Sequence, residues 1–178
     1  LYSTSIIFVP NKSLSSNFIN SNLKFTLTDF FQLTKIRLAL SVVFSSLAGY
    51  FLAADNIDVK LILLLFIGGF SMVGASNAFN QLIEKDKDDL MERTLGRPLQ
   101  SKRMTSFQVL SFGLVLSLIG IATLYMINIK TALVGAISIC LYVFIYTPLK
   151  SITPLSVFFG AIPGAIPYML GWVAYTNS

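Results

Sequence analysis

The sequence predicts an all-α fold, a polytopic bundle of about five transmembrane helices, from three observations. Hydrophobic residues make up 54% of the chain, charged residues make up 12%, and the mean hydropathy is +0.74. This composition is far more apolar than that of an average soluble domain. The apolar residues also occur in long unbroken runs, without the polar alternation that strands of a membrane barrel require. The chain is therefore expected to lie in a lipid bilayer, and no basic stripe with exposed aromatics indicates a nucleic-acid partner.

Five apolar runs are each close to the roughly 20 residues that a helix needs to cross about 30 Å of hydrocarbon. Backbone groups in lipid have no water partners, so each run should be helical. The predicted spans are residues 38–54, 61–83, 107–127, 131–147 and 155–175.

The segment before the first span differs from the rest of the chain. Residues 1–28 are rich in Ser and Asn and contain no acidic residue, which predicts a polar, disordered tail. Residues 29–178 are then assigned to one transmembrane domain. Because the first residue is Leu1 and not Met, we expect the chain to be truncated or processed at this end.

The distribution of Lys and Arg predicts the orientation of the bundle. Alternating the five spans places eleven of the thirteen basic residues on one side and only Lys60 and Lys130 on the other. Short loops rich in Lys and Arg remain in the cytoplasm. The loop after the second span is therefore expected to face the cytoplasm, or the matrix in a mitochondrion, and the bacterial inner membrane is the favoured location. Lys35 and Arg37 are interpreted as ordinary members of this basic side.

Residues 77–99 hold five of the eight acidic residues of the chain and carry the candidate site. Asn80, Glu84 and Asp88 follow one another at intervals of four, so a continuing helix would place them on one face. Asp86 lies beside them in the sequence. Oxygen ligands suit Mg²⁺, which is usually held by one or two carboxylates together with substrate phosphates. We therefore predict a magnesium site at Asn80, Glu84, Asp86 and Asp88.

Two arginines follow the acidic residues. Arg93 and Arg97 are again four apart, and the guanidinium group is well shaped for bidentate phosphate contacts. Acids for a metal and bases for a phosphate would then share one loop. A solvated connector in which acids and bases merely balance one another is the simpler interpretation of the same residues, and composition alone favours it.

Three ordered blocks of sequence resemble the UbiA-type intramembrane prenyltransferases, and most closely the branch that farnesylates protohaem IX. The first block is NQLIEKDKD at 80–88, followed by RTLGRPL at 93–99; the second is YTPLK at 146–150, followed by GAIPGAIP at 160–167 and GW at 171–172; the third is LTKIR at 33–37. The resemblance spans roughly residues 30–176. Glu84 stands where the family more often has Asp, and Ser151 replaces a usual Arg.

The resemblance implies an activity. It implies magnesium-dependent transfer of a farnesyl group from farnesyl diphosphate to a vinyl group of protohaem IX, giving haem O. Asn80, Glu84 and Asp88 would be the catalytic residues, while Arg93, Arg97, Tyr146 and Lys150 would bind the diphosphate. Without the resemblance, Tyr146 and Lys150 are simply an interfacial aromatic and a cytoplasmic base.

The resemblance also implies nine membrane helices and a second acidic motif in a later half of the protein. No second acidic cluster follows Glu92 in this sequence. We therefore expect these 178 residues to be an N-terminal portion that is inactive alone.

Three alternative functions are weighed against this one. A related enzyme could prenylate an aromatic acid or a quinone precursor, although the GAIP and GW blocks favour the haem branch. A membrane cation transporter would be expected to carry an acidic residue near the middle of a span, and none is present. A non-catalytic assembly subunit would tolerate Asp88→Asn without loss of product.

Overall fold

The computed structural model describes residues 27–150 and 152–177, and within these ranges every regular element is a helix. Five helices are long and apolar enough to cross a membrane, which confirms the predicted all-α membrane bundle. The helices are α2 (Leu27–Thr34), α3 (Ile36–Ala53), α4 (Val59–Ile83), α5 (Lys85–Asp88), η1 (Glu92–Thr94), α6 (Ser106–Tyr125), α7 (Ile129–Cys140), η2 (Leu141–Tyr146), α8 (Thr147–Leu149) and α9 (Ser156–Thr176).

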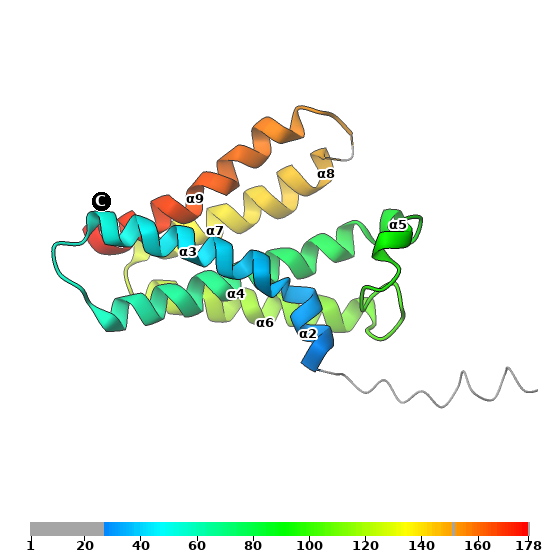
Figure 1. The fold of residues 1–178 in the computed structure, drawn as a ribbon, viewed down its shortest axis with the longest axis horizontal. Helices are drawn as coiled ribbons and strands as arrows, with labels where there is room; N and C mark the ends of the chain where they lie inside the picture. The colour runs from blue at the N-terminus through cyan, green and yellow to red at the C-terminus, as the bar shows by residue number, and fades with distance from the viewer. Residues whose placement is uncertain (1–26, 151, 178) are drawn as a thin grey trace, which may run out of the picture.

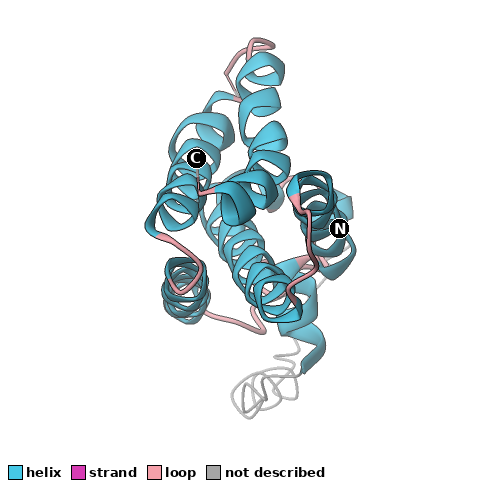
Figure 2. Ribbon diagram, turned by 90° about the vertical axis from the view of Figure 1, so that its left-hand side faces the viewer, coloured by secondary structure: helices cyan, strands magenta, loops and turns pink. Residues whose placement is uncertain are grey.

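The long helices run up and down along one axis (Figure 1). Helix α4 packs mainly on α6, and α3 packs mainly on α9, with α7 between the two pairs. Helices α2, α5 and α8 lie at one end of the bundle, and the α3–α4 loop lies at the other end with the C-terminus (Figure 1). Figure 2 views the same helices from the α3–α4 loop end.

The described part of the chain begins with a short helix at the end of the predicted tail. Most of the predicted tail, residues 1–26, lies outside the described residues. Leu27 and Thr28 already belong to α2, a short helix that hydropathy did not predict. This helix ends where Lys35 adopts a left-handed backbone conformation (φ 50°, ψ 62°), and α3 begins directly afterwards.

Side-chain caps set the starts of three membrane helices. Asp58 accepts hydrogen bonds from the backbone N–H groups of Lys60 and Leu61 at the start of α4. Thr105 and Gln108 form a reciprocal capping box at the start of α6. Asn128 accepts from the Thr131 N–H at the start of α7. Each cap satisfies N–H groups that have no partner within their own helix.

The fourth predicted span is one continuous helical stretch that changes its winding. Helix α7 passes into the π-helical segment η2 and then into α8. Within this stretch the Thr147 N–H bonds to the Tyr142 carbonyl, five residues back. Pro148 has no N–H to donate, which removes one α-helical bond at this point. Thr147 and Lys150, at the end of this stretch, both contact Asn80 of α4.

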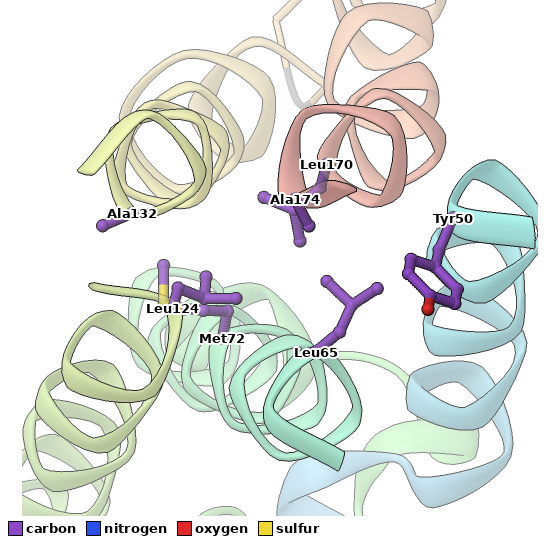
Figure 3. Close-up of a cluster of buried hydrophobic side chains, with 7 residues drawn as sticks. All are labelled: Tyr50, Leu65, Met72, Leu124, Ala132, Leu170 and Ala174. Atoms are coloured by element: carbon purple, nitrogen blue, oxygen red, sulfur yellow. The ribbon is translucent and has the colours of Figure 1, made fainter. Parts of the chain in front are cut away.

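The main core lies between the two helix pairs at the α3–α4 loop end. It contains Tyr50, Leu65, Met72, Leu124, Ala132, Leu170 and Ala174 (Figure 3). A smaller cluster of Leu33, Ala78, Leu99, Met104 and Val109 fixes α2 and the loop after α5 against α4 and α6. This second cluster therefore fixes the position of the loop after α5, which carries Arg93 and Arg97.

Candidate functional site

A polar cavity of about 810 Å³ opens at the end of the bundle that carries α2, α5 and α8. It is lined by Lys35, Asn80, Glu84, Lys87, Asp88, Met91, Arg93, Arg97 and Lys150. We call this cavity the polar pocket. It brings together, from α4, the following loop and the residue after α8, most of the charged residues that the sequence singled out.

The acidic residues keep the alignment that their spacing predicts, although the helix assignment is interrupted at Glu84. The Glu84 N–H bonds to the Asn80 carbonyl at 3.0 Å, and the Asp88 N–H bonds to the Glu84 carbonyl at 2.9 Å. These bonds carry the four-residue helical repeat from α4 into α5. Asn80, Glu84 and Asp88 therefore all line the same cavity.

Asn80 is the centre of a buried hydrogen-bond network. Its Nδ2 donates to Glu84 Oε2 at 2.9 Å, and its Oδ1 accepts from Lys150 Nζ at 3.2 Å. Thr147 Oγ1 also lies 3.2 Å from this Oδ1. Lys150 Nζ completes the network with an ion pair to Glu84 Oε1 at 2.7 Å and lies 5.7 Å from the centre of the Tyr146 ring. Residues about 70 positions apart are thus held in one fixed arrangement.

A second ion pair closes the other side of the polar pocket. Arg97 Nη1 pairs with Asp88 Oδ2, whose side chain is only 6% exposed. The Thr94 hydroxyl bonds to the Asp88 backbone carbonyl, which folds the loop back onto α5. Glu84 and Asp88 are therefore each paired with a base, and both bases line the polar pocket.

Lys35 also faces the polar pocket, contrary to its interpretation as an ordinary basic residue. Burial lowers the pKa of its ammonium group, and the positive charges of Arg97 and Lys150 lower it further. An anion between these three bases would relieve their repulsion. The LTKIR block was the signal that pointed to Lys35, while Arg37 is exposed and lines no part of this cavity.

Asp86 does not line the polar pocket, and its side chain is exposed. Residues two apart on a helix do not share a face, so Asp86 points away from Glu84 and Asp88. Tyr146 contacts Lys150 but lines a neighbouring cavity.

That neighbouring cavity lies inside the bundle, between α3, α4, α9 and the α7–η2 stretch. It has a volume of about 390 Å³ and is lined by Leu38, Val42, Ser45, Val73, Ser76, Asn77, Ser138, Tyr142, Tyr146, Gly160, Pro163, Gly164 and Pro167. We call it the inner cavity. A Cβ atom at Gly164 would meet no atom within 4 Å, so this side of α9 borders open space. Tyr146 links the inner cavity to Lys150 and hence to the polar pocket.

The UbiA prenyltransferase family matches residues 42–178 of the chain. The chain belongs to this family. Curated relatives named protoheme IX farnesyltransferase are 60% identical over 152 residues in Christiangramia forsetii and 56% identical over 158 residues in Flavobacterium psychrophilum. These alignments cover 85% and 87% of this chain but 51% and 53% of the relatives. The chain thus spans about half the length of the curated relatives it matches.

A solved structure from work on digeranylgeranylglyceryl phosphate synthase has the same fold over the matched region. Its TM-score is 0.77 at 20% sequence identity, and the match covers 83% of this chain and 53% of that one. Family membership and the five apolar helices together make this UbiA chain an integral membrane protein.

UbiA prenyltransferases generally use a divalent metal ion, and the donors of the polar pocket can be tested against that requirement. Among the residues that the structure describes, no three His, Cys, Asp or Glu side chains lie close enough together to enclose a metal. The pocket does offer the carboxylates of Glu84 and Asp88 and the Asn80 Oδ1. Such an oxygen-only set with two carboxylates fits a hard cation that shares its remaining positions with substrate phosphates.

Proposed function

We propose that the whole protein of which this chain is part transfers a farnesyl group from farnesyl diphosphate to a vinyl group of protohaem IX, giving haem O. The observation that carries the proposal is the polar pocket, in which two carboxylates and five bases face one space beside the inner cavity. The names of the relatives supply the acceptor and the prenyl chain.

In this proposal the polar pocket binds the diphosphate. Glu84 and Asp88, with Asn80, would hold Mg²⁺, and the bound ion would supply positive charge to offset the negative charge of the leaving diphosphate. Lys35, Arg93, Arg97 and Lys150 bind its oxygens directly, and the ion pairs of Lys150 and Arg97 keep both bases in place before the substrate arrives. Bidentate contacts from the arginines would orient the diphosphate.

The reaction breaks the allylic C–O bond of farnesyl diphosphate, and the electron pair leaves with the diphosphate. The terminal vinyl carbon of protohaem IX attacks the resulting allylic carbon, and water then adds its oxygen to the other vinyl carbon and releases a proton. The apolar side chains of the inner cavity shield the allylic carbon from premature attack by water. Tyr142 and Tyr146 offer aromatic faces to the developing positive charge.

The test uses the full-length protein in membranes, supplied with protohaem IX, farnesyl diphosphate and either Mg²⁺ or EDTA, with detection of the farnesylated haem by mass spectrometry. We expect product with Mg²⁺, none with EDTA, and a loss of at least about 100-fold for Asp88→Asn, because it removes charge from the metal and diphosphate site. Asp86→Asn is the matched control, since Asp86 lies outside the polar pocket.

Two outcomes would contradict the proposal in different ways. A folded protein that leaves protohaem IX unchanged but prenylates an aromatic acid would replace the acceptor and keep the diphosphate site. Full product formation by Asp88→Asn would show that the acidic motif that contains Asp88 is not needed for the reaction.

A further inference from the structure

Helix α2 is attached at both ends to parts of the molecule that build the polar pocket. At its N-terminal end, Arg103 Nε donates to Asp29 Oδ1 at 2.7 Å, and Arg103 Nη2 donates to Gln32 Oε1 at 2.9 Å. The same Nη2 donates to the Gly96 carbonyl at 3.0 Å. One guanidinium group therefore joins α2 to the loop that follows α5.

At its C-terminal end, α2 is held by buried amides of α4. Asn77 Nδ2 donates to the Thr34 carbonyl at 3.0 Å, and Gln81 Nε2 lies 3.5 Å from the Leu33 carbonyl. The last carbonyls of a helix have no partner within it, so these amides replace water that a buried helix end cannot reach. Lys35, which faces the polar pocket, comes directly after this attachment.

Through Arg103, the Gly96 carbonyl connects α2 to the loop that carries Arg93 and Arg97. Most of residues 91–97 are exposed, and Thr94 is the buried exception. Gly96 is followed by Arg97, which pairs with Asp88. Holding the Gly96 carbonyl therefore limits where the Arg97 side chain can start, and Arg93 lies on the same short loop.

We propose that α2 is a brace for the polar pocket and that Arg103 is a positioning residue, which fixes the loop of Arg93 and Arg97 relative to Lys35 without touching the diphosphate itself. This inference rests on the proposed function only for the statement that the polar pocket binds a metal diphosphate. It adds an explanation of how Lys35, Arg93 and Arg97, which come from distant parts of the chain, are held close enough together to bind the same anion.

Arg103 and Asp29 differ in how much each contributes to the brace. Arg103 contacts Asp29, Gln32 and the Gly96 carbonyl, and the contact with Asp29 is one of these three. Arg103→Gln removes the guanidinium group that joins α2 to the loop after α5. Asp29→Asn leaves the contacts of Arg103 with Gln32 and Gly96. Arg103→Gln should therefore disturb the polar pocket more than Asp29→Asn does.

The experiment measures binding of Mg²⁺ with inorganic pyrophosphate to the purified full-length protein by calorimetry, together with kcat and the KM for farnesyl diphosphate and for protohaem IX. We expect Arg103→Gln to weaken pyrophosphate binding and to raise the KM for farnesyl diphosphate about 10- to 100-fold. Losses of this size are typical when a residue that orients a ligand-binding side chain is replaced. The KM for protohaem IX should change little.

Asp29→Asn should have a smaller effect, and Arg103→Lys, which keeps the charge beside Asp29, should recover part of the loss. Lys102→Gln, an exposed neighbour of Arg103, is the matched control.

The inference is overturned if Arg103→Gln lowers the unfolding temperature while pyrophosphate binds as in the unsubstituted protein, because Arg103 would then act only on stability. Equal losses for Lys102→Gln and Arg103→Gln would also overturn it, because general loop charge would explain both. If the unsubstituted protein binds pyrophosphate but leaves protohaem IX unchanged, the proposed acceptor fails, and the binding data for Arg103→Gln still decide the role of the brace.

Discussion

Asn80 has no charge, yet it holds two charged residues of the polar pocket together. Its amide donates to Glu84 and accepts from Lys150, so one residue uses both of its polar atoms to join an acid to a base. It is 1% exposed, and a buried amide in this position costs free energy unless both atoms are paired. Asn80 therefore holds Glu84, a proposed metal ligand, at a fixed distance from Lys150, a proposed diphosphate ligand.

Lys150 provides a direct test of the diphosphate-binding role. Lys150→Met keeps a long unbranched side chain and removes the ion pair to Glu84 and the hydrogen bond to Asn80. Interactions with a charged group contribute about 1.5–3 kcal/mol, so Mg²⁺–pyrophosphate should bind about 10- to 150-fold more weakly to the full-length protein. Calorimetry measures this change.

The control for Lys150→Met is Lys130→Met, at the opposite end of the bundle. Lys130 Nζ donates to the Asn177 carbonyl at 2.8 Å and faces no part of the polar pocket. Its replacement should leave pyrophosphate binding unchanged. Unaltered binding by Lys150→Met would show that the Glu84–Lys150 pair is only structural.

At the level of helices, the contact between α3 and α9 depends on two glycines. A Cβ atom at Gly171 would overlap the Ser46 carbonyl oxygen, and one at Gly49 would overlap the Tyr168 carbonyl oxygen. Small residues let membrane helices approach until their backbones touch, which strengthens dispersion contacts that lipid cannot replace. Helix α9 forms one wall of the inner cavity, so this contact also sets the cavity's width.

Gly171→Ala should therefore destabilise the bundle. The added methyl group cannot be accommodated by a side-chain movement, since the obstacle is backbone, and overpacking of this kind costs about 1–3 kcal/mol. Thermal unfolding of the full-length protein in detergent should show a lower midpoint. Gly164→Ala, on the same helix but facing open space, should leave the midpoint unchanged or slightly higher. Equal midpoints for the two variants would refute close α3–α9 packing.

The five membrane helices could be predicted because each is an apolar run of the right length with polar residues at its ends. Helix α2 could not, since its eight residues are too few to be stable alone and depend on Asn77, Gln81 and Arg103 from distant parts of the chain. The π-helical winding of η2 was also missed. Hydropathy shows which residues are apolar, but it contains no information about the backbone hydrogen bond that Pro148 cannot donate.

Across the whole molecule, the candidate site was predictable where it depends on local spacing and not where it depends on tertiary contacts. The four-residue spacing of Asn80, Glu84 and Asp88 places them on one cavity wall. Asp86 was grouped with them by proximity in sequence, although a two-residue offset points it elsewhere. Lys35 was interpreted as an ordinary base because hydropathy and spacing do not show that α2 is folded against α4, next to the polar pocket.

The arrangement of the helix ends leads to a prediction about orientation in the membrane. Lys35, the bases of the loop after α5 and Lys150 lie at one end of the bundle. At the other end, the Asp55 N–H contacts the Tyr175 hydroxyl and Lys130 contacts Asn177. Lys60, in the first turn of α4, follows the α3–α4 loop at this same end. Because basic loops remain in the cytoplasm, we predict that the polar pocket faces the side of the membrane where soluble diphosphates and Mg²⁺ occur.

Cysteine labelling of the full-length protein in a bacterial inner membrane tests this orientation. In a background with Cys140→Ser and no other cysteine, Asn56→Cys should react with a membrane-impermeant maleimide added from the periplasmic side. Asp89→Cys should react only after the membrane is permeabilised, because both positions are exposed but lie at opposite ends of α4. The reverse pattern would place the polar pocket outside the cytoplasm, where intracellular farnesyl diphosphate could not reach it, and would contradict both the orientation and the proposed reaction.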